Sequence, residues 1–168
     1  MKNARGFTLI EMVAVIIIIA ILAAAVAPMA LSSLRAYDAT LNSITTLDKL
    51  RYATERLARE LRAVNYNGTN FIINMSTSAP VFTKTDGVAV TVGNAVPTVT
   101  LAYSTIAATP TPVLTDQVSA LSFAYYDQDG VSTASSSAVR YVEISLTLAQ
   151  GAQLYSQRTR VALRNRYS

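Results

Sequence analysis

An apolar run of 25 residues, from Phe7 to Leu31, constrains this chain more than any other feature of its sequence. About 20 apolar residues in a helix are enough to cross the hydrocarbon core of a bilayer. The run contains a single charged side chain, Glu11, close to its start. An ionised carboxylate within a membrane costs roughly 2.5–3.5 kcal/mol, so an acid at this position is expected to have a function. Its natural partner is a positive charge nearby.

Three kinds of segment fit this run. A plain signal anchor agrees with the hydropathy alone. A secretory signal peptide needs a small-residue cleavage site, which Ala25-Val26-Ala27 would supply, but Pro28 follows that site and Glu11 interrupts the apolar core. The third kind is a membrane helix that begins after a processing site at Gly6. Cleavage there would create an α-amino group on Phe7, which could pair with Glu11 of its own chain or of a neighbouring copy.

Residues 1 to about 30 resemble the prepilin leader of type IV pilins and type II secretion pseudopilins. The resemblance lies in a basic head that ends in Gly6, in Phe7-Thr8-Leu9-Ile10-Glu11, and in a β-branched and alanine-rich helix interrupted at Pro28. In that family a prepilin peptidase cuts after the glycine on the cytoplasmic side and N-methylates the new terminus. The resemblance therefore implies cleavage between Gly6 and Phe7, conversion of Phe7 to N-methylphenylalanine, and roles in assembly for Glu11 and Pro28.

The composition limits the classes of function. The 168 residues include no cysteine and no histidine, so disulfides are excluded and the commonest metal ligands and general bases are missing. The net charge of +4 falls to +2 if Lys2 and Arg5 leave with the leader, which gives no reason to expect a nucleic-acid partner. The same two residues place the N-terminus in the cytoplasm and the rest of the chain in the periplasm. We expect no enzyme activity and no cofactor.

After Pro28 a helical pattern continues to about Val64. Apolar residues recur at three- and four-residue spacing, which predicts an amphipathic helix with one apolar stripe. The opposite face is charged, and Asn65-Tyr66-Asn67-Gly68 is a stop signal. The stripe consists of Leu34, Tyr37, Leu41, Ile44, Leu47, Leu50, Ala53, Leu57, Leu61 and Val64, and the charged face of Asp48, Arg51, Glu55, Arg56, Arg59, Glu60 and Arg62.

From Asn70 onward, two-residue alternation and frequent turn residues predict short strands. Asp86-Gly87 is a hairpin-type turn, and Ser132–Ser137 is expected to be a loop. Strands are expected at Phe71–Ile73, Val88–Val92, Thr98–Tyr103, Leu121–Tyr125, Val142–Leu148 and Leu154–Leu163.

The predicted fold is α+β. A long N-terminal helix, transmembrane in its first half and amphipathic in its second, packs on a C-terminal antiparallel β-sheet. The chain would then consist of a leader (1–6), a transmembrane polymerisation helix (7–31), an amphipathic helix (32–66) and a β-rich globular domain (67–168).

Three groups of side chains offer candidate chemistry. Asp127 and Asp129 could supply oxygen ligands to calcium, but they form only a fragment of a calcium loop, and a polar turn is the stronger interpretation. A cluster of arginines could touch DNA phosphates, although a solvated strand face explains it more simply. The tyrosines are expected to fill the core between helix and sheet. The clustered arginines are Arg158, Arg160, Arg164 and Arg166, and the seven tyrosines expected in the core are Tyr52, Tyr66, Tyr103, Tyr125, Tyr126, Tyr141 and Tyr155.

Two further segments, Tyr52–Arg62 and Val139–Arg164, are similar to J-type minor pseudopilins and W-type minor pilins, and the pattern also resembles minor subunits of mannose-sensitive haemagglutinin-type pili. The resemblance implies a minor subunit that initiates or caps a filament at the inner membrane. Its partners would be other pilin or pseudopilin subunits, the prepilin peptidase and the inner-membrane assembly platform. Two alternatives remain: a DNA-binding competence pilin, and a non-polymerising membrane-anchored adhesin that retains residues 1–6.

Overall fold

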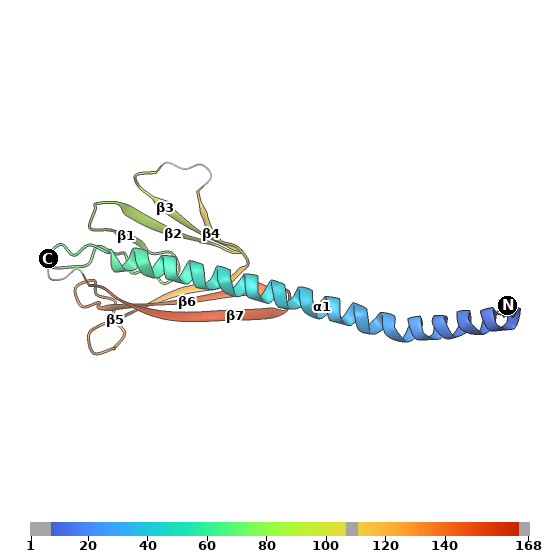
Figure 1. Cartoon of the computed structure of the whole chain (residues 1–168). Coiled ribbons are helices and arrows are strands. Elements are labelled where there is room, and N and C mark those ends of the chain that lie inside the picture. The colour runs from blue at the N-terminus through green and yellow to red at the C-terminus, as the bar shows by residue number, and fades with distance from the viewer. Residues whose placement is uncertain (1–7, 107–110, 165–168) are drawn as a thin grey trace, which may run out of the picture. The chain divides into compact units, whose positions relative to one another are not determined.

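The computed structural model describes residues 8–106 and 111–164. Within these residues a single α-helix, α1 (Leu9–Arg62), precedes seven strands, which confirms the α+β class (Figure 1). The strands are β1 (Val81–Thr83), β2 (Ala89–Ala95), β3 (Thr98–Tyr103), β4 (Val113–Thr115), β5 (Val118–Tyr126), β6 (Tyr141–Gln150) and β7 (Gln153–Ala162). The chain divides into two compact units, Met1–Asn42 and Ser43–Ser168.

The first unit contains the apolar part of α1. Its large apolar side chains, from Leu9 to Leu31, are exposed, and this part of the helix is long and apolar enough to cross a membrane. The helix continues through Pro28 without interruption. Directly after the proline, the hydroxyls of Ser32 and Ser33 both donate to the carbonyl of Met29, at 2.9 and 3.0 Å.

In the second unit the antiparallel strands form two sheets, with the orders β1-β2-β3-β4 and β5-β6-β7. The clearest alternation in the sequence lies on β6, the central strand of the smaller sheet. Val142, Ile144, Leu146 and Leu148 are all fully buried on one face of this strand. The opposite face is more polar, so β6 confirms the predicted half-buried strand.

The C-terminal part of α1 packs into the core of this second unit. Leu50, Leu57 and Leu61 belong to the same buried cluster as residues of both sheets, such as Phe82 and Ile144. Complete burial of a leucine side chain contributes roughly 1.5–3 kcal/mol. The helix is therefore a structural part of the globular unit and not only its connection to the N-terminus.

We predicted one apolar stripe along a single side of α1 from Leu34 onward. In the structure the stripe does not stay on one side of the helix. Ile44 and Leu47 are 51% and 48% exposed, whereas Leu50 and Ala53 are buried. These four residues follow one another at intervals of three. Because three residues turn an α-helix by about 300°, each step moves the stripe by about 60° around the axis. The stripe thus winds from the exposed side to the buried side within three steps.

Two short strands escaped prediction and one predicted strand is absent. β1 and β4 have three residues each, which is too short for alternation to be recognised. Phe71–Ile73 was predicted as a strand but makes only isolated bridges, from Phe71 to Tyr66 and from Ile73 to Phe82. The segment is nevertheless part of the core, because Phe71 and Ile73 are buried.

The tyrosines fill the core less than expected. Of the seven tyrosines expected there, Tyr125 alone is buried, and its hydroxyl donates to the carbonyl of Ser76 at 2.6 Å. Burial raises the pKa of the Tyr125 phenol. Tyr52 is 62% exposed. Three others, Tyr66, Tyr103 and Tyr155, are partly buried against the core.

We predict that a chain beginning at Ser32 folds in water and that Leu57→Asp unfolds it. An unpaired carboxylate in this core should cost more than about 4 kcal/mol. Leu47→Asp is the matched control, since it makes the same change on the same helix at an exposed position. Thermal unfolding followed by circular dichroism would compare the two variants. Equal melting temperatures would contradict the described packing of α1.

Candidate functional site

The N-terminal end of α1 is a capping box formed by Thr8 and Glu11. The backbone N–H of Glu11 donates to Thr8 Oγ1, and the backbone N–H of Thr8 donates to Glu11 Oε2, both at 3.3 Å. These contacts satisfy two backbone donors that the helix itself leaves free. The Glu11 carboxylate also lies at the positive end of the helix dipole, which favours its charge.

The capping box gives Glu11 a role that our sequence interpretation missed. The signal was present, because Thr8-Leu9-Ile10-Glu11 has the spacing of a capping box. Gly6 and Phe7 lie outside the described residues, so cleavage at Gly6 and pairing of Glu11 with the Phe7 amine stay predictions. Pro28 lies within α1, and its role in assembly likewise stays a prediction.

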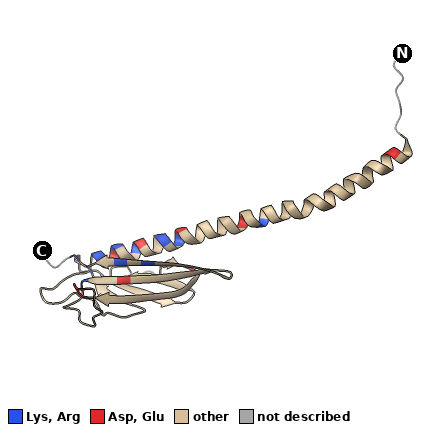
Figure 2. Ribbon diagram, turned by 90° about the horizontal axis from the view of Figure 1, so that it is seen from below, with Lys and Arg blue, Asp and Glu red and all other residues tan. Residues whose placement is uncertain are grey.

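The segment of α1 that follows Glu11 is free of charge as far as Arg35. Figure 2 shows one acidic position near the start of α1 and the other charged positions from its middle to its C-terminal end. A surface of exposed isoleucine, leucine and valine without charges suits lipid or the apolar faces of similar helices. One carboxylate, that of Glu11, therefore lies at the start of a long apolar segment of α1.

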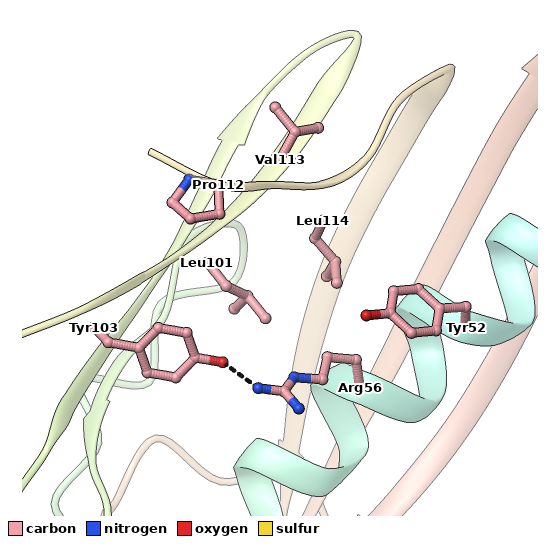
Figure 3. Close-up of a pocket in the computed structure, with 7 residues that line it drawn as sticks. All are labelled: Tyr52, Arg56, Leu101, Tyr103, Pro112, Val113 and Leu114. Carbon is pink, nitrogen blue, oxygen red and sulfur yellow. Dashed lines mark hydrogen bonds between the residues drawn. The ribbon is translucent and has the colours of Figure 1, made fainter. Parts of the chain in front are cut away.

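A second polar site joins α1 to the four-stranded sheet around Glu60, whose residue is only 6% exposed. Arg56 Nη2 lies 2.9 Å from Glu60 Oε1, and the Tyr103 hydroxyl donates to the same oxygen at 2.9 Å. Lys84 Nζ lies 3.7 Å from Glu60 Oε2 and 3.1 Å from Asp86 Oδ2. Arg56 also donates to the Tyr103 hydroxyl (Figure 3). Helix, β3 and the turn after β1 thus meet at one carboxylate.

The contacts within this cluster favour the charged forms of Arg56, Lys84 and Asp86. The hydrogen bond to Tyr103 raises the pKa of Arg56, and the hydrogen bond to Asp86, together with the charge of Glu60, raises the pKa of Lys84. The backbone N–H of Val88 and the Lys84 ammonium lower the pKa of Asp86. Burial raises the pKa of the Tyr103 phenol.

The prediction that Glu60 belongs to the charged outer face of α1 was wrong. Glu60 follows Ala53 by seven residues, which is close to two helical turns, so it shares the buried side of the helix. The i,i+4 spacing from Arg56 was a second signal, since it supplies the ion pair that makes burial of a carboxylate tolerable. This cluster attaches α1 to the four-stranded sheet, so its role is to position the helix.

A pocket of about 290 Å³ lies beside the cluster, between α1 and strands β3 and β4. Leu101 and Leu114 line it, together with Tyr52, Arg56 and Tyr103 (Figure 3). The guanidinium of Arg56 is already neutralised by Glu60, so the pocket offers no unpaired cation to an anionic ligand.

The calcium candidates form a hydrogen-bonded turn. Asp127 Oδ1 accepts from the backbone N–H groups of Asp129 and Val131, at 3.0 and 2.9 Å. Gly130 between them has φ +79°, a conformation that glycine adopts without strain. Within residues 8–106 and 111–164, no group of three or more acidic, histidine or cysteine side chains is placed to hold a metal ion.

The arginines of the last strand are partly neutralised. Arg158 and Arg160 on β7 both approach Glu143 on β6, at 3.5 and 3.3 Å. The Arg160 guanidinium also lies over the ring of Tyr126, 4.4 Å from its centroid. Arg164 is exposed, and Arg166 lies outside the described residues. These contacts fit a solvated sheet face better than a row of free phosphate ligands.

We predict that Glu60→Ala destabilises the globular unit by about 3 kcal/mol, because it leaves two cations and a phenol without their buried partner. Glu55→Ala removes a carboxylate from the same helix, where it pairs with Arg51 in a largely exposed ion pair. That control should change the free energy of unfolding by no more than about 0.5 kcal/mol. Denaturant titration of both variants measures the difference. Similar losses in the two variants would refute the special role of Glu60.

Comparison with known proteins identifies the N-terminal end of the chain. Residues 1–27 match the family described as the prokaryotic N-terminal methylation motif. No curated protein matches the chain. The match covers the basic head, the capping box and most of the charge-free helix described above. The chain therefore carries the prepilin N-terminal methylation motif, which is the signature of type IV pilins and pseudopilins.

Proposed function

We propose that this protein is a minor pilin or pseudopilin, a low-abundance subunit that helps to initiate or cap a filament rooted in the inner membrane. The observation that carries the proposal is the methylation motif at residues 1–27, placed at the start of a helix that is apolar and charge-free for more than 20 residues. The motif implies processing by a prepilin peptidase and assembly with other pilins. The helix is long enough to hold the unassembled subunit in the membrane.

Processing would occur between Gly6 and Phe7, with the leader in the cytoplasm and the globular unit in the periplasm. Lys2 and Arg5 support this orientation, because basic residues favour the cytoplasmic side. Phe7 would then carry the new, methylated amine, four positions before Glu11. Before and after processing, the inner-membrane assembly platform would be the further partner.

Glu11 would act in assembly through its charge. In an apolar helix bundle, both the carboxylate and the Phe7 amine are poorly solvated, and their attraction offsets part of that cost. The pairing would also fix the register between neighbouring helices, because a shifted neighbour would leave Glu11 without a cation. Capping by Thr8 positions the carboxylate at the end of α1 but does not require its charge.

A minor role is supported by the similarity of Tyr52–Arg62 and Val139–Arg164 to J-type and W-type minor subunits. In the structure these segments are the buried end of α1 and the last two strands of the smaller sheet. The protein would work by assembly, with no turnover chemistry of its own.

We predict that charge and capping at the start of α1 can be separated by three substitutions. Glu11→Gln keeps a capping side chain but removes the charge, so it should insert normally and assemble poorly. Thr8→Val keeps the charge but removes the capping hydroxyl, at a cost of about 1 kcal/mol, so it should assemble nearly normally. Glu11→Leu removes both and should recover the fewest partner pilins. Co-purification of partner pilins, normalised to the membrane level of each variant, measures assembly.

Two outcomes of this experiment would count against the proposal. Full recovery of partners with Glu11→Leu would show that the carboxylate has no part in assembly. Equal amounts of this chain and of the other pilins in sheared filaments would contradict the minor role, since an initiating or capping subunit should be a small fraction of the filament.

A further inference from the structure

A pocket of about 590 Å³ lies along the outer edge of β5, the edge strand of the smaller sheet. Phe123, Ala124 and Tyr125 of β5 line it. The other lining residues come from two segments, which we call its walls: Asn74, Met75 and Thr77 before β1, and Ser132, Thr133 and Ala134 between β5 and β6. The volume falls within the range of small-ligand sites, about 300–1,000 Å³. The whole pocket belongs to the Ser43–Ser168 unit and does not depend on the assembly role.

The walls bond two of the four backbone N–H and C=O groups of Phe123 and Tyr125, which lie on the outer edge of β5. The N–H of Phe123 donates to the Thr77 carbonyl at 2.8 Å, and the N–H of Thr133 donates to the Tyr125 carbonyl at 3.0 Å. In an antiparallel strand the N–H and C=O of one residue point to the same edge, and its neighbours point to the other. The Phe123 carbonyl and the Tyr125 N–H therefore also face the pocket. In the part of the chain that the structure describes, no backbone group from the walls reaches either of them.

We propose that this pocket binds one residue of an uncharged peptide segment of a partner protein, through the main chain of that residue. A carbonyl and the N–H two residues later, on the same edge, pair with a single residue of a parallel strand. The bound residue would donate its N–H to the Phe123 carbonyl and accept from the Tyr125 N–H. This is strand addition at a sheet edge, reduced to its smallest unit.

The walls limit how much of a peptide can enter. Thr77 occupies the edge position before the free pair, and Thr133 occupies the position after it. A long added strand would collide with both. The geometry therefore fits a residue at the tip of a loop or at a chain end, whose neighbours leave the plane of the sheet.

The pocket is held open by hydrogen bonds within its own walls. The Tyr125 hydroxyl donates to the Ser76 carbonyl, and Asn74 Oδ1 accepts from the N–H groups of Ser76 and Val81, at 3.2 and 2.9 Å. On the other wall, Thr133 Oγ1 accepts from the N–H of Ser135 at 3.1 Å. A preformed site of this kind spends little of its binding free energy on ordering loops.

The lining selects against charge. No charged side chain belongs to the lining residues, which combine small apolar groups, such as Ala124 and Ala134, with hydroxyls and one carboxamide. A charged residue would lose hydration there without gaining an ionic partner. An uncharged residue is therefore the expected occupant.

The test uses isotope-labelled full-length protein in detergent micelles and two probes, N-acetylalanine N-methylamide and its analogue methylated on the alanine nitrogen. The first probe should shift the Tyr125 amide proton in a saturable way. The analogue cannot donate to Phe123, so it should bind about tenfold more weakly. Ala124→Leu adds three carbon atoms beside the position of the bound residue and should weaken binding. Ala120→Leu, on the same strand at an exposed position outside the pocket, should leave it unchanged.

Three results would overturn the proposal: no shift at Tyr125, equal affinities for the two probes, or undiminished binding to Ala124→Leu. If Ala124→Leu lowers the melting temperature, Ala134→Leu makes the same change in the wall between β5 and β6, at an exposed residue outside any strand. At least one of the two variants must weaken binding for the assignment to stand.

Discussion

Burial of one face of α1, between Leu50 and Leu61, is the contact on which the globular unit depends. Two sheets of four and three strands share no continuous ladder, yet their inner faces belong to the same buried cluster as this face of the helix. The helix that bears the methylation motif at one end is thus an internal element of the fold at the other. One element has to satisfy two environments, which explains why it carries no charge between Glu11 and Arg35 and many charges in its C-terminal part (Figure 2).

Polar contacts then fix what apolar burial leaves free. Hydrophobic packing is non-directional, so it would allow α1 to slide or rotate slightly on the sheets. The Glu60 cluster adds directional contacts from the helix to β3 and to the turn after β1, and Lys49 reaches Asp116 at 2.7 Å near the end of β4. At the far end of α1, the capping box of Thr8 and Glu11 fixes the first turn. The two carboxylates therefore serve different purposes, one in the core and one at the membrane.

Features that rest on local sequence patterns could be predicted for this chain, and features set by contacts between distant residues could not. The methylation motif, the helix and the alternating β6 all rest on local patterns, and all are confirmed. We did not predict the burial of Glu60, because we assigned this charged residue to the exposed face. Its position seven residues after Ala53 places it on the buried face. To predict the exposure of Ile44 and Leu47, we would have had to add up the helical rotation along the stripe and not only the spacing of its apolar residues. Among the described residues, the Phe123 carbonyl and the Tyr125 N–H lack backbone partners because of where two loops end. These loops are distant in sequence, so no local pattern predicts this.

We propose that the chain is processed as a prepilin and then enters a filament. The intact mass and N-terminal sequence of protein extracted from membranes, and of protein in sheared filaments, test it most directly. We predict a start at Phe7, a mass lower by residues 1–6 and higher by one methylation, and no such product from Gly6→Val. A mature protein that begins at Met1 or at Pro28 would contradict it.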